Sequence, residues 1–236
     1  MEFFCYHRDR PGSVALREEL LEEHWSYMDR YAAEMIARGP TLEGDTPTGS
    51  VHILDLRDPA AARAFAFDEP NYQAGAYRDV LLRRWRNALG RTMWDFAGGR
   101  TGGNRYLVLG LGTGQAADLV PPPGEDELIA YGPLLSDDGT AWLGTAALVR
   151  APDPDTARAL LTRIGMPTSR STTGGSAGGR PDRGRDRRPS QGALARCRYD
   201  LACRQARLDR SQVRLRQSIR VAPAPIDGRE GGTGSD

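Results

Sequence analysis

The stretch RGPTLEGD at residues 38–45 recurs later in the chain as YGPLLSDD at residues 131–138. Each copy is followed by a Gly-led segment (GSV at 49–51, GTA at 144–146) and then by an Asp-Pro pair that opens an Ala/Arg-rich run, at 58–59 and at 153–154. A repeat of this size indicates one supersecondary unit that is used twice. Because the second copy contains no histidine, the first copy is the candidate chemical site and the second is a candidate scaffold.

The charge of the chain is unevenly distributed. Residues 1–166 hold 17 arginines and 24 acidic residues, a net charge of −7, whereas residues 167–236 hold 15 arginines and 7 acidic residues, a net charge of +8. All 32 basic residues are arginine, which we attribute to GC-rich codon usage rather than to phosphate binding. The overall net charge of +1 therefore combines an acidic body with a basic tail.

The first unit alternates strand and helix signals. Aromatic residues predict a strand over 2–7, and Ser13 caps a predicted helix over 14–38 that ends at Arg38, Gly39 and Pro40. A short strand or loop over 41–48, a strand over 49–56, a helix that starts at Asp58-Pro59 and runs to 67, and a strand over 77–85 follow. This β-α-β-β-α-β order is α+β and ferredoxin-like.

The second unit repeats the pattern incompletely. Strands are predicted over 105–109, 128–131 and 141–150, and a helix over 155–164, but the long helix and the last strand are missing. We therefore divide the chain into a first domain at 1–90, a linker at 91–104, a degenerate second copy at 105–166 and a low-complexity tail at 167–236.

The tail is rich in Gly, Ser, Pro and Arg and is predicted to be disordered, with a weak helix signal over 192–220. Because the second copy lacks its last strand, one hypothesis is that the native reading frame ends near Gly165 and that the tail is a frameshift product. The alternative is a natural disordered linker or a nucleic-acid-binding tail. Sequencing the gene distinguishes these two readings.

Three general features point to a soluble cytoplasmic protein. The sequence has no apolar run of membrane-spanning length. Its first residues lack the pattern of a signal peptide. Its three cysteines form neither a disulfide framework nor a zinc pattern, which favours reduced thiols.

His24 is the candidate catalytic residue. On a helix it falls within the apolar stripe that contains Met28 and Tyr31, and a histidine in that position needs a polar partner. Asp45, which follows soon after the helix, is the expected partner; Glu43 and Asp55 are rivals. A His–carboxylate pair suits general acid/base chemistry. The plainer alternative is a structural histidine that bonds to a backbone carbonyl.

Metal and cofactor sites are not predicted. His7 and His52 are spaced unlike zinc ligands. The GLGTG segment at 110–114 resembles a nucleotide loop, but the prolines at 121–123 prevent the helix that a phosphate cradle needs.

Residues 1–86 resemble the YCII-related (YciI-like) domain family. The matching features are the aromatic first strand, EEH at 22–24, Gly39-Pro40 followed by Asp45, GS at 49–50 and DEPNYQAGAY at 68–77. The last segment resembles the family pattern Asp-Pro-Tyr-x-x-Ala-Gly-x-Tyr, with Glu69 and Asn71 read as insertions. Residues 105–164 look like a degenerate second copy.

The resemblance implies a dimeric α+β barrel with a His–Asp pair near the domain cleft, carried here onto His24 and Asp45. One type of member is described as a dehydrochlorinase of chlorinated hydroquinones. We therefore expect an enzyme that performs elimination, isomerisation or hydrolysis on a small molecule, or alternatively a non-catalytic ligand- or partner-binding module. The expected substrate-binding residues are Gly39, Pro40, Gly49, Ser50 and Tyr72.

The expected partners are a small-molecule ligand and a second copy of the fold. The barrel could close between two chains as a homodimer or within one chain as a pseudo-dimer, and the sequence does not choose between them. Neither a membrane nor a nucleic acid is expected, since the acidic body opposes binding to a polyanion.

Overall fold

The computed structural model describes residues 1–99, 104–115, 125–164 and 193–197. In the first half the elements are β1 (Glu2–Asp9), α1 (Val14–Glu19), α2 (Leu21–Asp29), β2 (Met35–Glu43), β3 (Thr46–Asp55), α3 (Pro59–Phe67), α4 (Pro70–Gln73) and β4 (Tyr77–Trp85). A 3-10 helix, η1 (Met93–Asp95), follows. In the second half they are β5 (Asn104–Gln115), a 3-10 helix η2 (Glu125–Glu127), β6 (Leu128–Leu135), β7 (Ala141–Ala151), α5 (Pro154–Ile164) and β8 (Ala193–Cys197).

The eight strands close into one barrel, in the order β1-β3-β2-β8-β5-β7-β6-β4. Around this circle the first half contributes the run β4-β1-β3-β2, and the second half contributes the equivalent run β8-β5-β7-β6. The two halves meet at the short antiparallel seams β2–β8 and β4–β6. The chain therefore has the ferredoxin-like α+β barrel architecture that its sequence predicts.

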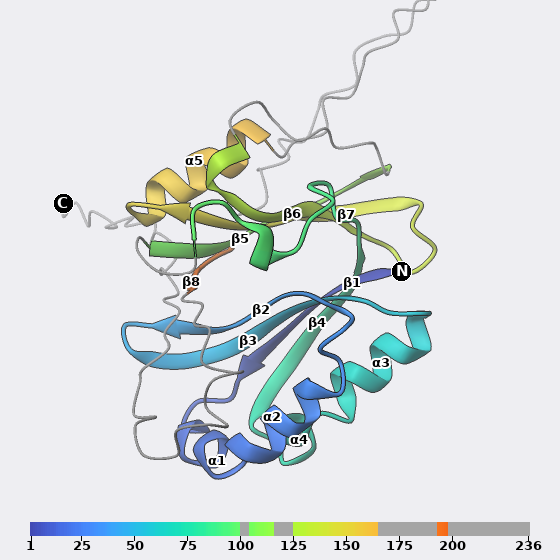
Figure 1. Cartoon of the computed structure of the whole chain (residues 1–236), viewed down its shortest axis with the longest axis vertical. Helices are drawn as coiled ribbons and strands as arrows, with labels where there is room; N and C mark the ends of the chain where they lie inside the picture. The colour runs from blue at the N-terminus through green and yellow to red at the C-terminus, as the bar shows by residue number, and fades with distance from the viewer. Residues whose placement is uncertain (100–103, 116–124, 165–192, 198–236) are drawn as a thin grey trace, which may run out of the picture.

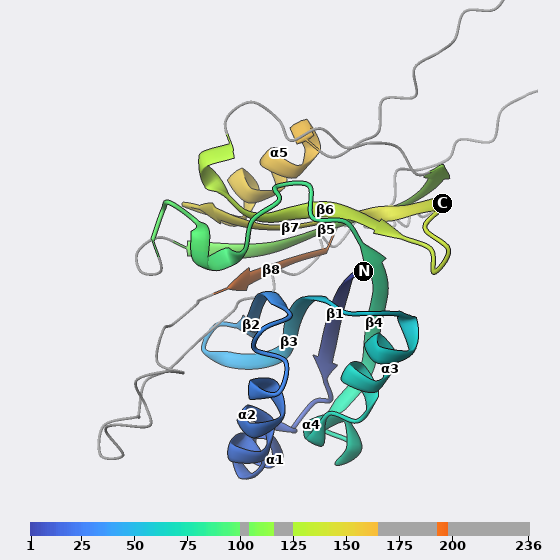
Figure 2. The same cartoon turned by 45° about the vertical axis from the view of Figure 1, so that its right-hand side comes forward.

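The molecule has four layers, which Figure 1 shows as α5, the sheet of the second half, the sheet of the first half, and helices α1 to α4. Strand alternation explains this layering, because successive side chains point to opposite faces. In β1, Phe4 and Tyr6 belong to the core between the sheets, whereas Phe3 and Cys5 belong to the core under the helices. Figure 2 shows from a second angle that α1 to α4 lie on the side of the first sheet away from the second.

The start of α3 follows the sequence signal closely. Asp58 is extended and its side chain accepts a hydrogen bond of 2.7 Å from the backbone N–H of Ala61, while Pro59 occupies the first helical position. This arrangement satisfies an N–H group that has no partner within the helix.

The predicted helix over 14–38 is wrong in its second half. The helical segment ends at Asp29, and Met35–Glu43 is strand β2. Met35, Ile36 and Ala37 are all buried in the sheet, and β2 pairs with β3 from Met35↔Leu54 to Glu43↔Thr46. Gly39-Pro40 therefore lies inside a strand rather than at a helix end. Pro40 is tolerated because β2 pairs with its other neighbour, β8, only at Thr41 and Leu42.

The prediction that the second half lacks its last strand is also wrong. Strand β8 pairs with β5 over Arg105↔Cys197 to Leu109↔Ala193, which is the position that β4 holds beside β1. The weak helix signal fails at these five residues because pairing with β5 and β2 outweighs local propensity. The frameshift hypothesis itself stays a prediction that the gene sequence would decide. Most of the predicted disordered tail lies outside the described residues.

Candidate functional site

Three histidines and one glutamate gather between the first sheet and its helices. His7 lies on β1, His24 on α2, His52 on β3, and Glu69 directly before α4. The ring centroid of His52 is 5.9 Å from that of His7 and 6.2 Å from that of His24. We call these four residues the histidine cluster.

His24 and Glu69 form the closest polar contact of the cluster. His24 Nδ1 lies 2.6 Å from Glu69 Oε1, and the side chains are 12% and 0% exposed. The other ring nitrogen of His24, Nε2, has no hydrogen-bond partner among the described residues. The carboxylate can only accept, so Nδ1 donates its hydrogen, and in the neutral form of the imidazole Nε2 carries the lone pair.

Glu69 is held ionised by its surroundings. Its Oε1 also accepts from Asn71 Nδ2 at 3.0 Å, and its Oε2 accepts from the backbone N–H of Tyr72 at 2.8 Å, as the cap of α4. Burial raises the pKa of the Glu69 carboxyl, but the hydrogen bond and charge of His24 and the Tyr72 N–H outweigh burial and bring the pKa below its ordinary value.

His7 is fixed by bonds at both ring nitrogens. Its Nε2 donates to the carbonyl of Ala66 at 2.7 Å, which leaves Nδ1 to face the Cys5 sulfur at 3.6 Å. Burial lowers the pKa of His7, although the Ala66 carbonyl opposes this. Burial raises the pKa of the Cys5 thiol. His7 is therefore a neutral imidazole with a fixed orientation in the histidine cluster.

A buried ion pair borders the cluster. Arg17 on α1 contacts Asp9 at 2.7 Å and Ser50 Oγ at 2.8 Å, and its guanidinium lies 5.6 Å from the centre of the Tyr77 ring. The side chains of Arg17 and Asp9 are 14% and 6% exposed. Burial raises the pKa of Asp9 against the opposing effect of Arg17. This pair ties α1 to β1 and β3.

The structure does not bring Asp45 to His24. Asp45 is exposed between β2 and β3, beside Gly44, whose φ of +62° makes the turn. The rival partners are also elsewhere: Glu43 is exposed at the end of β2, and Asp55 bonds to the N-terminal ammonium of Met1. The cause is that the helical segment ends at Asp29. Residues 35–43 then form the first strand of the β2–β3 hairpin, and Asp45 lies in the turn of that hairpin.

The predicted substrate-binding residues fall into two groups. Gly39 and Pro40 are strand residues of β2, and Pro40 lies opposite Ser50 in the ladder. Gly49 has a packing role, since a Cβ there would lie 2.2 Å from the His7 carbonyl oxygen. Ser50 is bound to Arg17, and the Tyr72 ring lies 6.5 Å from the His7 ring. Ser50 and Tyr72 thus border the cluster.

Glu69 is the site residue that sequence reasoning missed. Its signal was present, because an acidic residue directly before a proline is typical of a helix start. Aligning Pro70, Ala74 and Tyr77 with the family pattern quoted above places Glu69 at the Asp position. No insertion is then needed, so reading Glu69 as inserted was the error.

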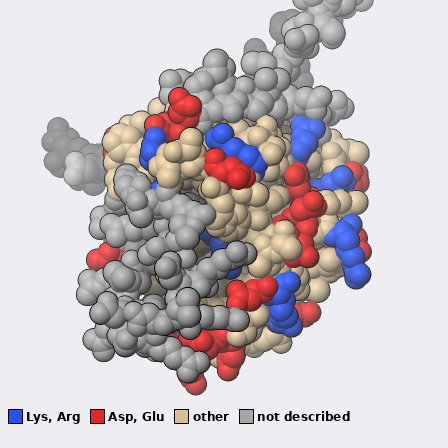
Figure 3. All heavy atoms as spheres, in the orientation of Figure 1, with Lys and Arg blue, Asp and Glu red and all other residues tan. Residues whose placement is uncertain are grey.

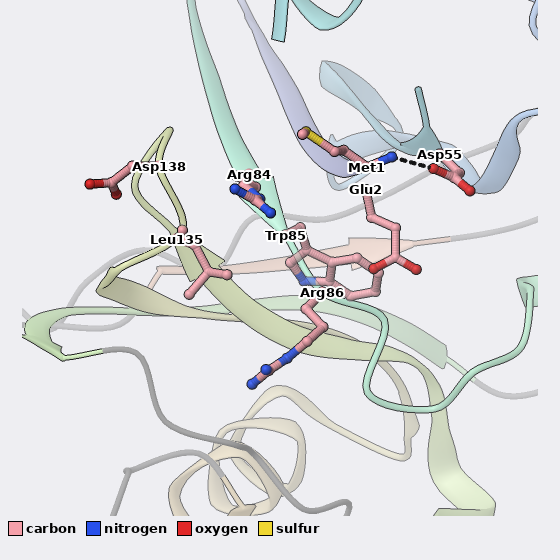
Figure 4. Close-up of a pocket in the computed structure, with 9 residues that line it drawn as sticks. Met1, Glu2, Asp55, Arg84, Trp85, Arg86, Leu135 and Asp138 are labelled. Carbon is pink, nitrogen blue, oxygen red and sulfur yellow. Dashed lines mark hydrogen bonds and ion pairs between the residues drawn. The ribbon is translucent and has the colours of Figure 1, made fainter. Parts of the chain in front are cut away.

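A pocket of about 420 Å³ lies elsewhere, where the β6–β7 turn meets the ends of β1, β3 and β4. Figure 4 shows its lining residues, which include Glu2, Asp55, Arg84, Trp85 and Asp138. Strands rise about 3.3 Å per residue, so Asp55 is about 10 Å along β3 from His52. Its acids are already bonded: Asp55 to the N-terminus, Glu2 to the backbone N–H of Asn87, and Asp138 within its own turn. We therefore place the candidate chemistry at the histidine cluster.

The described part of the face drawn in Figure 3 shows no patch of a single charge sign. On the face drawn in Figure 3, the arginines and acidic residues of the described part are interspersed. Within the described ranges, no group of three or more His, Cys, Asp or Glu has metal-site geometry. In that same part of the chain, no helix is both long and apolar enough to span a membrane.

The first half is thus a ferredoxin-like α+β domain with a buried His–carboxylate pair between its sheet and its helices. Residues 1–86 match the family model of the YCII-related domain, so this part of the chain is a YCII-related domain. A similar solved structure is the 5-chloro-2-hydroxyhydroquinone dehydrochlorinase of Burkholderia phenoliruptrix AC1100, in complex with 2,5-dihydroxybenzoquinone. It is 28% identical, with a TM-score of 0.36, over 37% of this chain and 95% of that chain. No curated protein matches the chain.

Proposed function

We propose that the YCII-related domain is a small-molecule enzyme in which His24 is the general acid/base and Glu69 its orienting carboxylate. The observation that carries this proposal is the 2.6 Å contact between His24 Nδ1 and the fully buried Glu69, with Nε2 left without a described partner. Membership of the YCII-related family over residues 1–86 supports the same role.

The geometry supports a simple proton cycle. His24 Nε2 takes a proton from the substrate, and the imidazolium that forms lies against the Glu69 carboxylate. Because hydrogen bonds lower the pKa of Glu69, the carboxylate stays ionised and stabilises that positive charge. Nε2 then delivers the proton to the product. Proton transfer of this kind serves elimination, isomerisation or hydrolysis.

The two histidines beside His24 do not oppose the positive charge of its imidazolium. Burial lowers the pKa values of His7 and His52, so both stay neutral beside His24. Arg17 is paired with Asp9. Among the described residues, Glu69 forms its ion pair with His24 alone.

The test is a turnover screen with three panels of substrates: enolisable ketones, hydroxylated aromatics and esters, each followed by proton NMR. For any substrate that turns over, His24→Gln and Glu69→Gln should each lower kcat at least 100-fold, which is the lower end of acid/base contributions. The matched control is Asp45→Asn, which removes an exposed carboxylate and should leave kcat unchanged.

Two results would contradict the proposal. The first is wild-type turnover by folded His24→Gln. The second is saturable binding of small molecules without turnover of any panel member, which would favour a non-catalytic binding module instead.

A further inference from the structure

His52 is a buried residue with an unused nitrogen. Its side chain lies in the middle of β3, opposite Cys5 on β1 and Arg38 on β2, and the residue is 3% exposed. Its Nδ1 is buried and has no hydrogen-bond partner among the described residues. Since buried polar atoms in folded proteins are nearly all bonded, this nitrogen points to a ligand or water that completes it.

The aromatic and imidazole rings packed against His52 do not supply the missing partner. Both nitrogens of His7 are already engaged, by Ala66 and by Cys5. Phe65, whose ring is 5.4 Å away, has no polar atom. Among the ring nitrogens beside His52, the one without a described partner is Nε2 of His24, since Nδ1 of that ring is held by Glu69.

The separation of the His24 and His52 rings suits a shared third atom. Their centroids are 6.2 Å apart, which is longer than a direct imidazole–imidazole hydrogen bond allows. It is short enough for one oxygen atom that bonds to both rings, as bridging groups do in polar sites. Two neighbouring rings therefore each keep a nitrogen without a partner among the described residues.

The charges around the cluster favour an uncharged ligand. Glu69 is ionised and fully buried, and Arg17 is already neutralised by Asp9. Burial lowers the pKa of His52 well below its usual range, so His52 is neutral. An anionic group would be repelled by the Glu69 carboxylate, although Arg38, which lies opposite His52 on β2, adds a positive charge that no described residue neutralises.

We infer that His52 contacts the substrate, with its Nδ1 and His24 Nε2 binding the same hydroxyl or carbonyl oxygen of an uncharged small molecule. This inference rests on the proposed function and names its substrate class. For a hydroxyl, His52 Nδ1–H donates to the oxygen while the O–H donates to His24 Nε2. When the O–H bond breaks and the Nε2–H bond forms, His52 holds the resulting oxyanion. For a carbonyl, the oxygen accepts from His52 Nδ1–H and from His24 Nε2–H, which is present in the imidazolium form of the proton cycle.

The first experiment asks whether His52 is structural. His52→Leu fills a similar volume and removes the unpaired nitrogen, and His52→Gln keeps a polar group at the site. The urea midpoint of His52→Leu at pH 7 should equal or exceed that of the wild type, because the leucine loses no hydrogen bond. A clearly lower midpoint for His52→Leu, with His52→Gln near the wild type, would assign His52 a structural bond and overturn the inference.

The second experiment measures binding with named probes. Phenol and cyclohexanone carry the hydroxyl and the carbonyl; fluorobenzene and benzoate are their oxygen-free and anionic counterparts. Imidazole ¹⁵N resonances of His24 and His52 should shift saturably with phenol or cyclohexanone only, and His52→Leu should weaken that binding at least tenfold. No shift with either oxygen probe means that a buried water alone fills the site, and equal shifts with benzoate remove the preference for an uncharged ligand; both overturn the inference.

These outcomes separate the two proposals. If phenol or cyclohexanone binds through His52 while His24→Gln leaves turnover unchanged, the binding site stands and the proposed catalytic role fails. If His24→Gln abolishes turnover while His52→Leu leaves both binding and kcat unchanged, the catalytic role stands and the inference about His52 fails.

Discussion

Replacing Glu69 by glutamine should destabilise the protein, whereas the same isosteric change at Asp45 should not. The Glu69 carboxylate accepts three hydrogen bonds, from His24 Nδ1, Asn71 Nδ2 and the Tyr72 N–H. A glutamine can accept on one side only, so its NH₂ group faces either the His24–Asn71 donors or the Tyr72 N–H. One buried donor is then unpaired, at about 1–3 kcal/mol, and a charge-assisted bond of about 1.5–3 kcal/mol is weakened.

We therefore expect Glu69→Gln to lower the free energy of unfolding by about 3 kcal/mol at pH 7. Asp45→Asn, at an exposed turn without a partner in the described part of the chain, should change it by less than about 0.5 kcal/mol. Urea unfolding followed by tryptophan fluorescence measures both. The two variants have the same chemistry, so their difference reports the site alone.

The pH dependence gives a second readout of the same pair. The pKa of Glu69 is lower in the folded protein than its unfolded value of about 4.3. Its contribution is therefore complete above about pH 4.3 and is lost as the pH falls through the folded pKa. The gap between wild type and Glu69→Gln should close in that acid range. A cost below about 0.5 kcal/mol at pH 7, or an equal cost for Asp45→Asn, would refute the reasoning.

Three further predictions concern packing, pH and assembly. Gly49→Ala places a Cβ 2.2 Å from the His7 carbonyl oxygen and should cost about 3 kcal/mol or more, whereas Gly114→Ala, whose nearest neighbour is 3.7 Å away, should cost less than about 1 kcal/mol in the same urea assay. Because the pKa values of His7 and His52 are lowered on folding, their contribution to stability is complete above about pH 6.5 and is lost as the pH falls, by up to about 1.4 kcal/mol per pH unit for each. His52→Leu should flatten this slope, and profiles that stay parallel to the wild type between pH 7 and pH 5 would contradict it. Because the barrel closes within one chain, sedimentation should give the 25.8 kDa monomer, and a stable dimer would contradict this expectation.

The sequence and the structure agree where local signals decide the outcome. Asp58-Pro59 predicts the start of α3 because a carboxylate cap and a proline are both favourable at that position in any context. The run 77–85 predicts β4 because its composition suits a half-buried strand. The repeat of RGPTLEGD as YGPLLSDD coincides with β2 and β6, which hold equivalent places in the barrel. That the second half arose as a YCII-related copy stays a prediction.

They differ where distant contacts outweigh local preference. A helix to Arg38 has good helix formers and a Gly-Pro stop, but Met35, Ile36 and Ala37 are instead buried in a strand that pairs with β3. Because this segment is a strand rather than a helix, Asp45 lies away from His24. Strand β8 has no signal of its own, since five residues of ordinary propensity become a strand only when β5 and β2 are present to pair with them.

The sequence by itself determined that His24 lies on the buried side of a helix, because a periodicity of 3.6 residues is a local property of the chain. Only the tertiary structure decided which carboxylate meets it, because Glu69 is 45 residues away and reaches His24 only when α4 packs beside α2. The same holds for His52, which is one polar residue in an apolar strand until the sheet and helices enclose it. Which residues far apart in sequence come into contact depends on the path of the whole chain. Local periodicity does not determine that path.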